Sequence, residues 1–283
     1  MRRLAALLAA LLLAAPALAE PAVVLPGSKL IRSYESETLN YTIERFLLDG
    51  VTCYLTRITM ADPGRQIRKA TAKWRRDVRV PSEIAKRLDS LPALVINGSG
   101  YVSPTYPEIP DNYPGTSADY YYTPLGSLTV VDGEVYRNLE GVPFYGLTLE
   151  ADGLHMYAGA DNEDVLARQP IQTWSFYEGC PMAENGVDIL DHAWPFANRR
   201  AIRTILCKLP EENTYLILTA TSSHGLTLVE ANDFLLAEFS PEWIYDLDGG
   251  PSSALFRRLE GKKKLKLIYG AGQRIVDVMG FVE

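Results

Sequence analysis

The 283-residue sequence has few of the features that mark several protein classes. It contains only three cysteines, and no two of them lie at the spacing of a metal site, so a structural zinc is not expected. After residue 19, no apolar run approaches the length of a membrane span. A formal net charge of −7 argues against a general nucleic-acid binder, which would have a basic footprint. No internal repeat or low-complexity linker is found, which predicts a single domain.

Residues 1–19 differ from the rest of the chain. Arg2 and Arg3 precede an apolar run, and Ala17-Leu18-Ala19 supplies the small residues of a cleavage site. This pattern predicts a secretory signal peptide that is cut before Glu20, and hence a secreted or periplasmic mature protein. An exported protein can form one disulfide among Cys53, Cys180 and Cys207, but the sequence does not choose the pair.

The hydrophobic pattern predicts an α+β fold: a mixed, mostly antiparallel central sheet with flanking helices. Apolar and β-branched runs, several joined by Asp-Gly turns, predict strands over 41–48, 51–59, 94–97, 126–135, 148–156, 171–176, 215–221 and 243–247. A short helix is expected to begin at Ser82 and a longer one to span 227–239. Thr227 and Glu230 have the spacing of a capping box, so Glu230 is left out of the candidate site.

The stretch from Tyr215 to Ser253 organises the rest of the chain. Strand, helix and strand are followed by Asp248-Gly249-Gly250-Pro251-Ser252-Ser253. A carboxylate at a strand end can point into a cleft, and glycines there let backbone N–H groups approach a ligand closely. These residues alone leave open whether the segment is a site or an ordinary turn.

A resemblance makes the segment more specific. Residues 223–230, Ser-His-Gly-Leu-Thr-Leu-Val-Glu, followed by the Asp248 turn resemble the signature of the phosphodiester glycosidase family. The run 94–101 resembles that family's Asn-Gly-Gly-Phe-Phe element, 171–181 its strand ending in Phe-Gly-Pro, and 272–282 its closing strand. We therefore expect a leader (1–19), an N-terminal extension with the first strand (20–50) and a family-like domain (51–283).

One further motif fits the family in two registers. Residues 198–207 resemble its Pro-Arg-Thr-Ala-Ile-Gly, with Arg203 and Thr204 on the Arg-Thr pair and Cys207 on the glycine. The other register places Arg199 on that arginine. We prefer the first, because its distance from the Tyr215 strand suits the family better. An arginine suits a phosphodiester because its planar fork bonds two oxygens at once.

The family includes a lysosomal enzyme that removes N-acetylglucosamine from a mannose phosphodiester, and bacterial proteins of exopolysaccharide loci. The resemblance implies hydrolysis of the sugar C1–O bond of a glycosyl-1-phosphodiester or a related exopolysaccharide linkage, without cofactor or metal. Asp248 is the predicted catalytic carboxylate, and His224 is expected to move a proton to or from water. The residues expected to bind the glycan or sugar phosphate are Asn97, Gly98, Glu178, Arg203, Thr204, Gly249, Gly250 and Ser252.

Two alternatives remain at this stage. Pro251 replaces a family glycine and lacks an N–H, and Cys207 replaces another glycine, so a glycan-binding protein with impaired turnover is the second hypothesis. The run Ser222-Ser223-His224 suggests a serine hydrolase as a further hypothesis. An adjacent Ser and His do not, however, supply a triad with an orienting Asp. The tyrosine-rich loop 101–122 is expected either to wall a glycan cleft or to pack on itself. The sequence does not indicate an oligomeric state.

Overall fold

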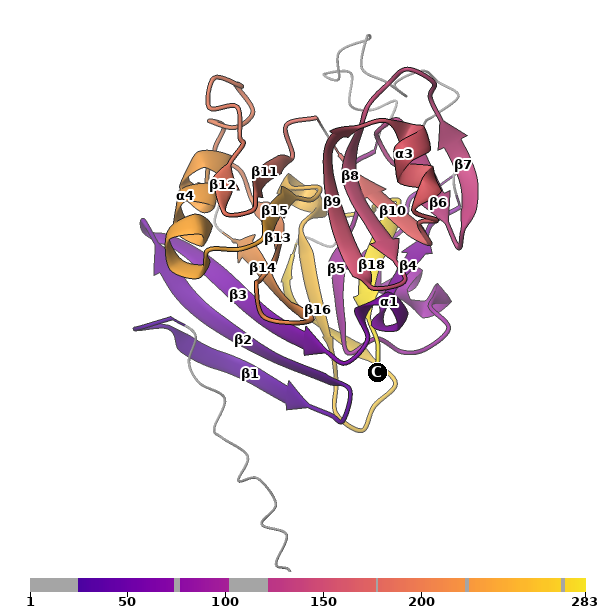
Figure 1. Ribbon diagram of the computed structural model, residues 1–283. Helices are drawn as coiled ribbons and strands as arrows, with labels where there is room; N and C mark the ends of the chain where they lie inside the picture. The colour runs from indigo at the N-terminus through magenta and orange to yellow at the C-terminus, as the bar shows by residue number, and fades with distance from the viewer. Residues whose placement is uncertain (1–24, 74–76, 102–121, 177, 222–223, 271–272) are drawn as a thin grey trace, which may run out of the picture.

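The computed structural model describes residues 25–73, 77–101, 122–176, 178–221, 224–270 and 273–283 (Figure 1). The predicted signal peptide, almost all of the tyrosine-rich loop, and Ser222 and Ser223 lie outside these residues. Within them, no helix is long and apolar enough to cross a membrane.

The largest sheet has eight antiparallel strands. Its hairpin over residues 39–60, with Asp49 and Gly50 at positive φ in the turn, pairs ten residues on each side, as the Asp-Gly signal predicts. In spatial order the strands are β1 (Lys29–Glu35), β2 (Leu39–Leu48), β3 (Val51–Met60), β14 (Thr214–Ala220), β13 (Arg203–Lys208), β15 (Trp243–Asp246), β11 (Pro181–Glu184) and β12 (Val187–Asp188). Helix α4 (Leu228–Phe239) connects β14 to β15, which flank β13 on its two sides.

Two five-stranded antiparallel sheets complete the β structure. One contains β7 (Glu134–Asn138), β6 (Leu128–Val131), β10 (Gln172–Ser175), β8 (Phe144–Glu150) and β9 (Gly153–Ala160) in spatial order. The other contains β17 (Leu265–Gly270), β16 (Ala254–Arg258), β5 (Leu94–Asn97), β18 (Asp277–Phe281) and β4 (Ile67–Thr71).

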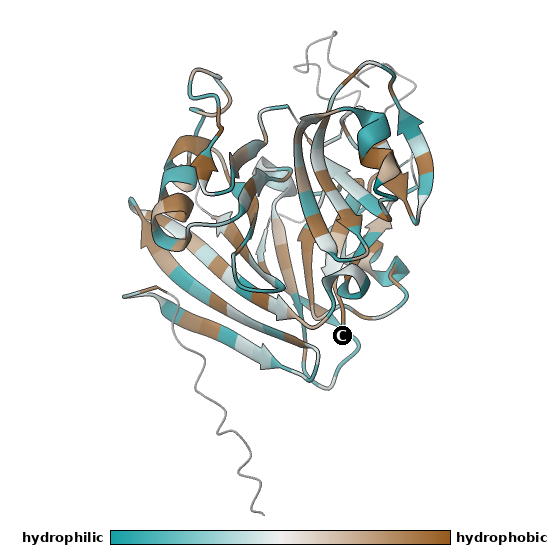
Figure 2. Cartoon of the chain, in the orientation of Figure 1, coloured by the Kyte–Doolittle hydropathy of each residue, from teal (hydrophilic) through white to brown (hydrophobic). Residues whose placement is uncertain are grey.

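The core has two main layers, one on each face of the eight-stranded sheet. On one face, Cys53, Ile205 and Leu216 pack against Leu228 and Leu235 of α4. On the opposite face, alternate residues of the same strands pack against the two smaller sheets, in a cluster that includes Leu206, Tyr215, Tyr245, Ile96 of β5 and Trp174 of β10. Figure 2 shows hydrophobic residues along α4 and the central strands, which is the pattern expected for buried faces.

The fold agrees with the predicted class in part. The strands are antiparallel and form a single body, but they make three sheets in place of one central sheet, and helices are few. Besides α4 they are α1 (Pro63–Gln66), α2 (Pro81–Ile84) and α3 (Asn162–Ala167), with short 3₁₀ turns, in the described residues. Ser82 does not cap α2: the helix begins at Pro81 and its N-cap, Val80, makes no side-chain capping bond. The capping box of Thr227 and Glu230 is present at α4. The predicted boundary at residue 51 stays a prediction.

The three cysteines form no disulfide. Cys53, Cys180 and Cys207 are all buried, and no pair of them is bonded sulfur to sulfur. Cys53 and Cys207 point into the layer under α4, whereas Cys180 belongs to the opposite layer. Burial raises the pKa of both thiols in the α4 layer, to about 12 for Cys53.

We therefore expect the native protein to resist thiol-specific reagents at pH 8. Unfolding without reductant should expose three reactive thiols per chain, because no disulfide holds any of them. Counting thiols with a chromogenic disulfide reagent, before and after addition of guanidinium, checks this. A count of one in the unfolded, unreduced protein would show that an oxidised pair exists after all.

Candidate functional site

The ends of several strands meet at one point of the fold. Strands β5 and β15 end at Asn97 and Asp246, and the residues that follow lie against each other: the Asp248 N–H donates to the carbonyl of Gly98 (3.2 Å). Strand β13 begins beside them, and the carbonyl of Thr204 accepts from the N–H of Leu247 (2.9 Å). The eight-stranded sheet and the β5–β18 sheet are thus joined at Asp248.

Asn97 fastens this junction through its buried side chain. Its Nδ2 donates to the Asp248 carbonyl (2.6 Å), and its Oδ1 accepts from Thr204 Oγ1 (2.9 Å) and from the Ala254 N–H (3.0 Å). These bonds connect four strand ends. The sequence predicts that Asn97 and Thr204 bind substrate. Their side chains bond to each other and to the backbone, however, so the contacts support a role in shaping the turn.

Asp248 itself is half-buried. Its carboxyl accepts hydrogen bonds from Ser252 and from the N–H of Gly249. Burial raises the pKa of Asp248 to about 7; the charges of Asp246 and Asp277 act in the same direction, and the two hydrogen bonds oppose them. A carboxyl with this pKa exchanges protons at neutral pH, which suits a catalytic acid or base.

Arg203 lies close to Asp248 in the fold but faces the layer under α4. Its side chain is 1% exposed, and Nη1 lies 3.3 Å from Asp246 Oδ2. Nε donates to the carbonyl of Leu226 and Nη2 to those of Phe196 and Arg199, and the guanidinium lies over the Phe196 ring. This arrangement argues against the predicted role of Arg203: a side chain that is buried and bonded within the protein has no surface for a phosphate.

The two glycine amides are also used within the protein. The N–H of Gly250 donates to the carbonyl of Ile202 (2.8 Å), and that of Gly249 to the Asp248 carboxyl. Gly249 has no room for a side chain, because a Cβ there would lie 2.9 Å from the Ile202 carbonyl oxygen. The bond of Gly250 argues against the predicted contact of its N–H with the phosphate, whereas the contact of Gly249 stays a prediction. The glycines allow the turn to fold tightly against β13.

A buried ion pair beside the turn was missed by the sequence prediction. Lys69 of β4 and Asp277 of β18 lie 2.8 Å apart (Nζ to Oδ2), and both side chains are 0% exposed. Asp277 Oδ1 also accepts from the N–H of Ser99 (2.6 Å). Lys69 stands in an Arg- and Lys-rich run without a clear period, and nothing in that run distinguishes this buried residue from its neighbours.

Glu178 lies in a neighbouring cleft. This exposed residue lines a cavity of about 450 Å³ together with Tyr145, Glu184, Asp191 and Trp194. The cleft is joined to the site by packing, since the Trp194 ring contacts Phe196 (4.8 Å between centroids), and the Phe196 ring lies against Arg203. His224 is exposed, and its proton-transfer role stays a prediction.

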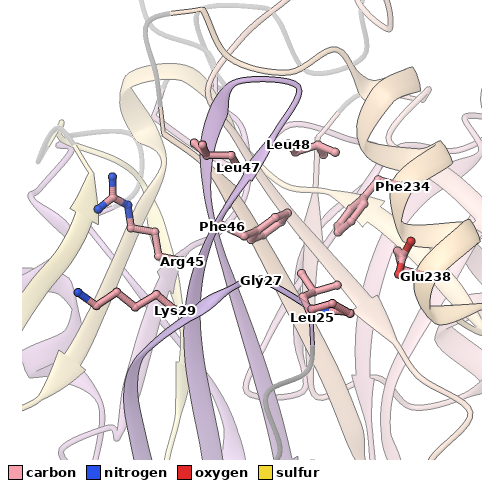
Figure 3. Close-up of a pocket in the computed structure, with 10 residues that line it drawn as sticks. Leu25, Gly27, Lys29, Arg45, Phe46, Leu47, Leu48, Phe234 and Glu238 are labelled. Atoms are coloured by element: carbon pink, nitrogen blue, oxygen red, sulfur yellow. The ribbon is translucent and has the colours of Figure 1, made fainter.

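Two other features lie away from this junction. The cavity in Figure 3, of about 630 Å³, lies between the β2–β3 hairpin and α4, and the stacked rings of Phe46 and Phe234 (5.3 Å between centroids) form part of its lining. Glu150, Asp152 and His155 bring ligand atoms close enough to hold a metal ion, but Glu150 Oε2 already accepts from Arg168 (3.1 Å). Ion pairs therefore account for the close approach of Glu150, Asp152 and His155.

Comparison with known proteins decides the family. The model of the phosphodiester glycosidase family matches residues 92–282, about two thirds of the chain. The chain belongs to the phosphodiester glycosidase family.

Solved structures share the fold of this family member. The catalytic domain of zebrafish N-acetylglucosamine-1-phosphodiester alpha-N-acetylglucosaminidase, auto-inhibited by its pro-peptide, matches with a TM-score of 0.64 and 16% identity, over 90% of this chain and 87% of that one. A hypothetical protein from Synechocystis matches with a TM-score of 0.56 and 14% identity, over 92% of this chain and 64% of that one. A search of curated proteins finds no match. All of the predicted site residues lie within the family match, whereas Lys69 precedes it.

Proposed function

We propose that this protein hydrolyses the sugar C1–O bond of a glycosyl-1-phosphodiester or a related exopolysaccharide linkage, with Asp248 as the reactive carboxylate. One observation carries the assignment. Three carboxyls meet at the strand junction; Asp246 is paired with Arg203 and Asp277 with Lys69, and Asp248 alone has no ion pair with a described residue. It is also the one of the three that is partly exposed.

The chemistry needs a carboxylate more than a strong acid. When the C1–O bond breaks, the leaving group is a phosphate monoester, whose second ionisation is near about pH 6, so it departs without full protonation. The sugar carbon then carries oxocarbenium-like charge, which an ionised Asp248 stabilises or attacks, and water supplies the oxygen of the new C1–OH. We propose that the exposed His224 accepts the proton that this water loses when it adds to C1, and later releases it to solvent.

The neighbouring cleft supplies a place for the rest of the substrate. Tyr145 and Trp194 offer aromatic rings, which pack against the C–H faces of sugars, and Glu178 offers a carboxylate that accepts from sugar hydroxyls. We propose that a glycan extending from the cleaved linkage lies here, on an exported protein released from its signal peptide.

Isotope labelling tests the proposal directly. The purified protein is incubated in H₂¹⁸O with a panel of glycosyl-1-phosphomethyl diesters that differ in sugar and anomer, and both products are analysed by mass spectrometry. Cleavage of C1–O places ¹⁸O in the sugar. Label in the phosphate would show P–O cleavage, a phosphodiesterase, and would contradict the proposal.

The second hypothesis, glycan binding with impaired turnover, rests on the missing N–H of Pro251. It predicts no labelled product with any member of the panel, together with saturable binding of one diester in calorimetry. Turnover of any member at rates well above the reaction without protein excludes it.

A further inference from the structure

Lys69 is a buried cation without an obvious purpose in the fold. Its ammonium lies 2.8 Å from Asp277, donates to the carbonyl of Thr173 and sits 5.3 Å from the centre of the Trp174 ring. Burial lowers the pKa of Lys69, while Asp277 and the more distant Asp132 raise it. A buried ion pair contributes little net stability compared with apolar residues of the same size, so stability gives no sufficient reason for placing one here.

Asp277 connects this cation to the candidate site. Its Oδ1 accepts from the N–H of Ser99 and its carbonyl from the N–H of Gly98 (3.2 Å). A Cβ at Gly98 would collide with Oδ1 of Asp277 and with the Trp174 ring, so a glycine is required for the carboxyl to lie so close. The carbonyl of Gly98, in turn, accepts the N–H of Asp248. Two consecutive hydrogen bonds thus lead from Asp277 through Gly98 to the backbone of Asp248.

The charges around Asp248 follow the same arrangement. In the described residues, Asp246 on β15 and Asp277 on β18 are the carboxyls that act on it, and each is held by a cation from a different strand: Arg203 of β13 and Lys69 of β4. Without Lys69, an ionised Asp277 would face Asp248 uncompensated.

We propose that Lys69 and Asp277 are positioning residues of the site: the pair holds the Gly98–Ser99 turn against Asp248 and sets the charge that Asp248 experiences. This inference rests on the proposed function of Asp248 and adds a residue that precedes the family match.

Two variants that change the charge near Asp248 in opposite directions test this proposal. Lys69→Met removes the cation, and the labelled carboxyl carbons report whether Asp277 stays ionised; in the pH range where it does, Asp248 should titrate about one pH unit higher. Asp277→Asn removes the anion, and in the pH range where Lys69 keeps its proton Asp248 should titrate about one unit lower. The double variant, Lys69→Met with Asp277→Asn, should titrate near the parent. The titration is followed by ¹³C NMR of protein labelled at the aspartate carboxyl carbons, with the Asp248 signal assigned by its loss in Asp248→Asn.

A matched control separates charge from damage to the fold. Glu150→Gln neutralises another buried carboxyl in an ion pair, that with Arg168, on a different sheet. It should lower stability without moving the Asp248 titration. Opposite shifts in the two single variants, mirrored by the acidic limb of kcat/KM, support the proposal. An unchanged Asp248 titration in both, or shifts of the same sign, overturns it.

The NMR titration needs no substrate. If the protein hydrolyses no diester but the two shifts are observed, the proposed function fails while the positioning role stands. If hydrolysis is found and the shifts are absent, the proposed function stands and the positioning role of Lys69 and Asp277 fails.

Discussion

Replacing Asp248 by asparagine should reduce kcat for a glycosyl phosphodiester by about 10³–10⁴-fold, the loss typical of removing one member of a catalytic group. Asparagine keeps the size of the side chain and can still bond to Ser252, but it cannot carry the negative charge that the sugar carbon needs in the transition state. KM should change much less, because the backbone bonds of residue 248 to Gly98 and Asn97 do not involve its side chain.

The same variant has a signature in pH. Burial raises the pKa of Asp248 to about 7, from 3.8 for the ordinary group. Activity that depends on the carboxylate should therefore rise as pH increases through about 7 and then level off. The effect on stability has the opposite dependence on pH. Because the folded state favours the protonated carboxyl, Asp248 adds to the free energy of unfolding below about pH 4, and this added stability is lost as pH rises through about 7.

Asp248→Asn removes this loss, and the variant should be more stable than the parent above pH 7 while it is inactive. Chemical denaturation at pH 5 and pH 8, beside kinetics at both, measures the two effects. Ser252→Ala is the matched control: it removes a hydrogen bond to the carboxylate but keeps the charge, and should retain turnover with a higher apparent pKa. Parental activity in Asp248→Asn would contradict the assignment.

Replacing Arg203 by methionine should lower the free energy of unfolding by about 3–5 kcal/mol, because it leaves the buried Asp246 without its cation. Burial already raises the pKa of Asp246 to about 7 against the opposing effect of Arg203, and without the guanidinium this carboxyl should be neutral at pH 7. Urea denaturation monitored by tryptophan fluorescence gives the size of the effect.

A second substitution distinguishes structural from substrate contacts. Arg203→Met combined with Asp246→Leu replaces the pair by apolar side chains, and should recover most of the stability lost in the single variant. If Arg203 bound the phosphate, as its place in the motif suggests, Arg203→Met would instead keep parental stability and raise KM. That outcome would reverse our interpretation of its burial.

Most strand positions could be predicted from the sequence because they depend on local pattern. The run 94–97 is fully buried as strand β5, the Asp49-Gly50 pair forms the predicted hairpin turn, and Thr227 caps α4. The division into three sheets could not be predicted, since it depends on which distant strands pair. Strand β16 pairs with β5, which lies far earlier in the chain, and no local signal specifies that partner.

The site was predictable in its position but not in its contacts. The family motifs led to Asn97, Arg203 and Asp248, and these do meet at one junction. Motifs do not specify which way a side chain faces, however. Because alternate strand residues point to opposite faces, Arg203 shares the α4 side with Ile205, while Thr204 faces Asn97 on the other side. Lys69 carried no signal, because its partner Asp277 lies at the far end of the chain.

The most direct test of the central claim is a crystal structure of Asp248→Asn with an intact glycosyl phosphodiester. We expect the anomeric carbon to lie within about 3.5 Å of the side chain of residue 248, the distance of a reactive pose. A sugar bound with C1 beside Glu178 and away from residue 248 would contradict the account.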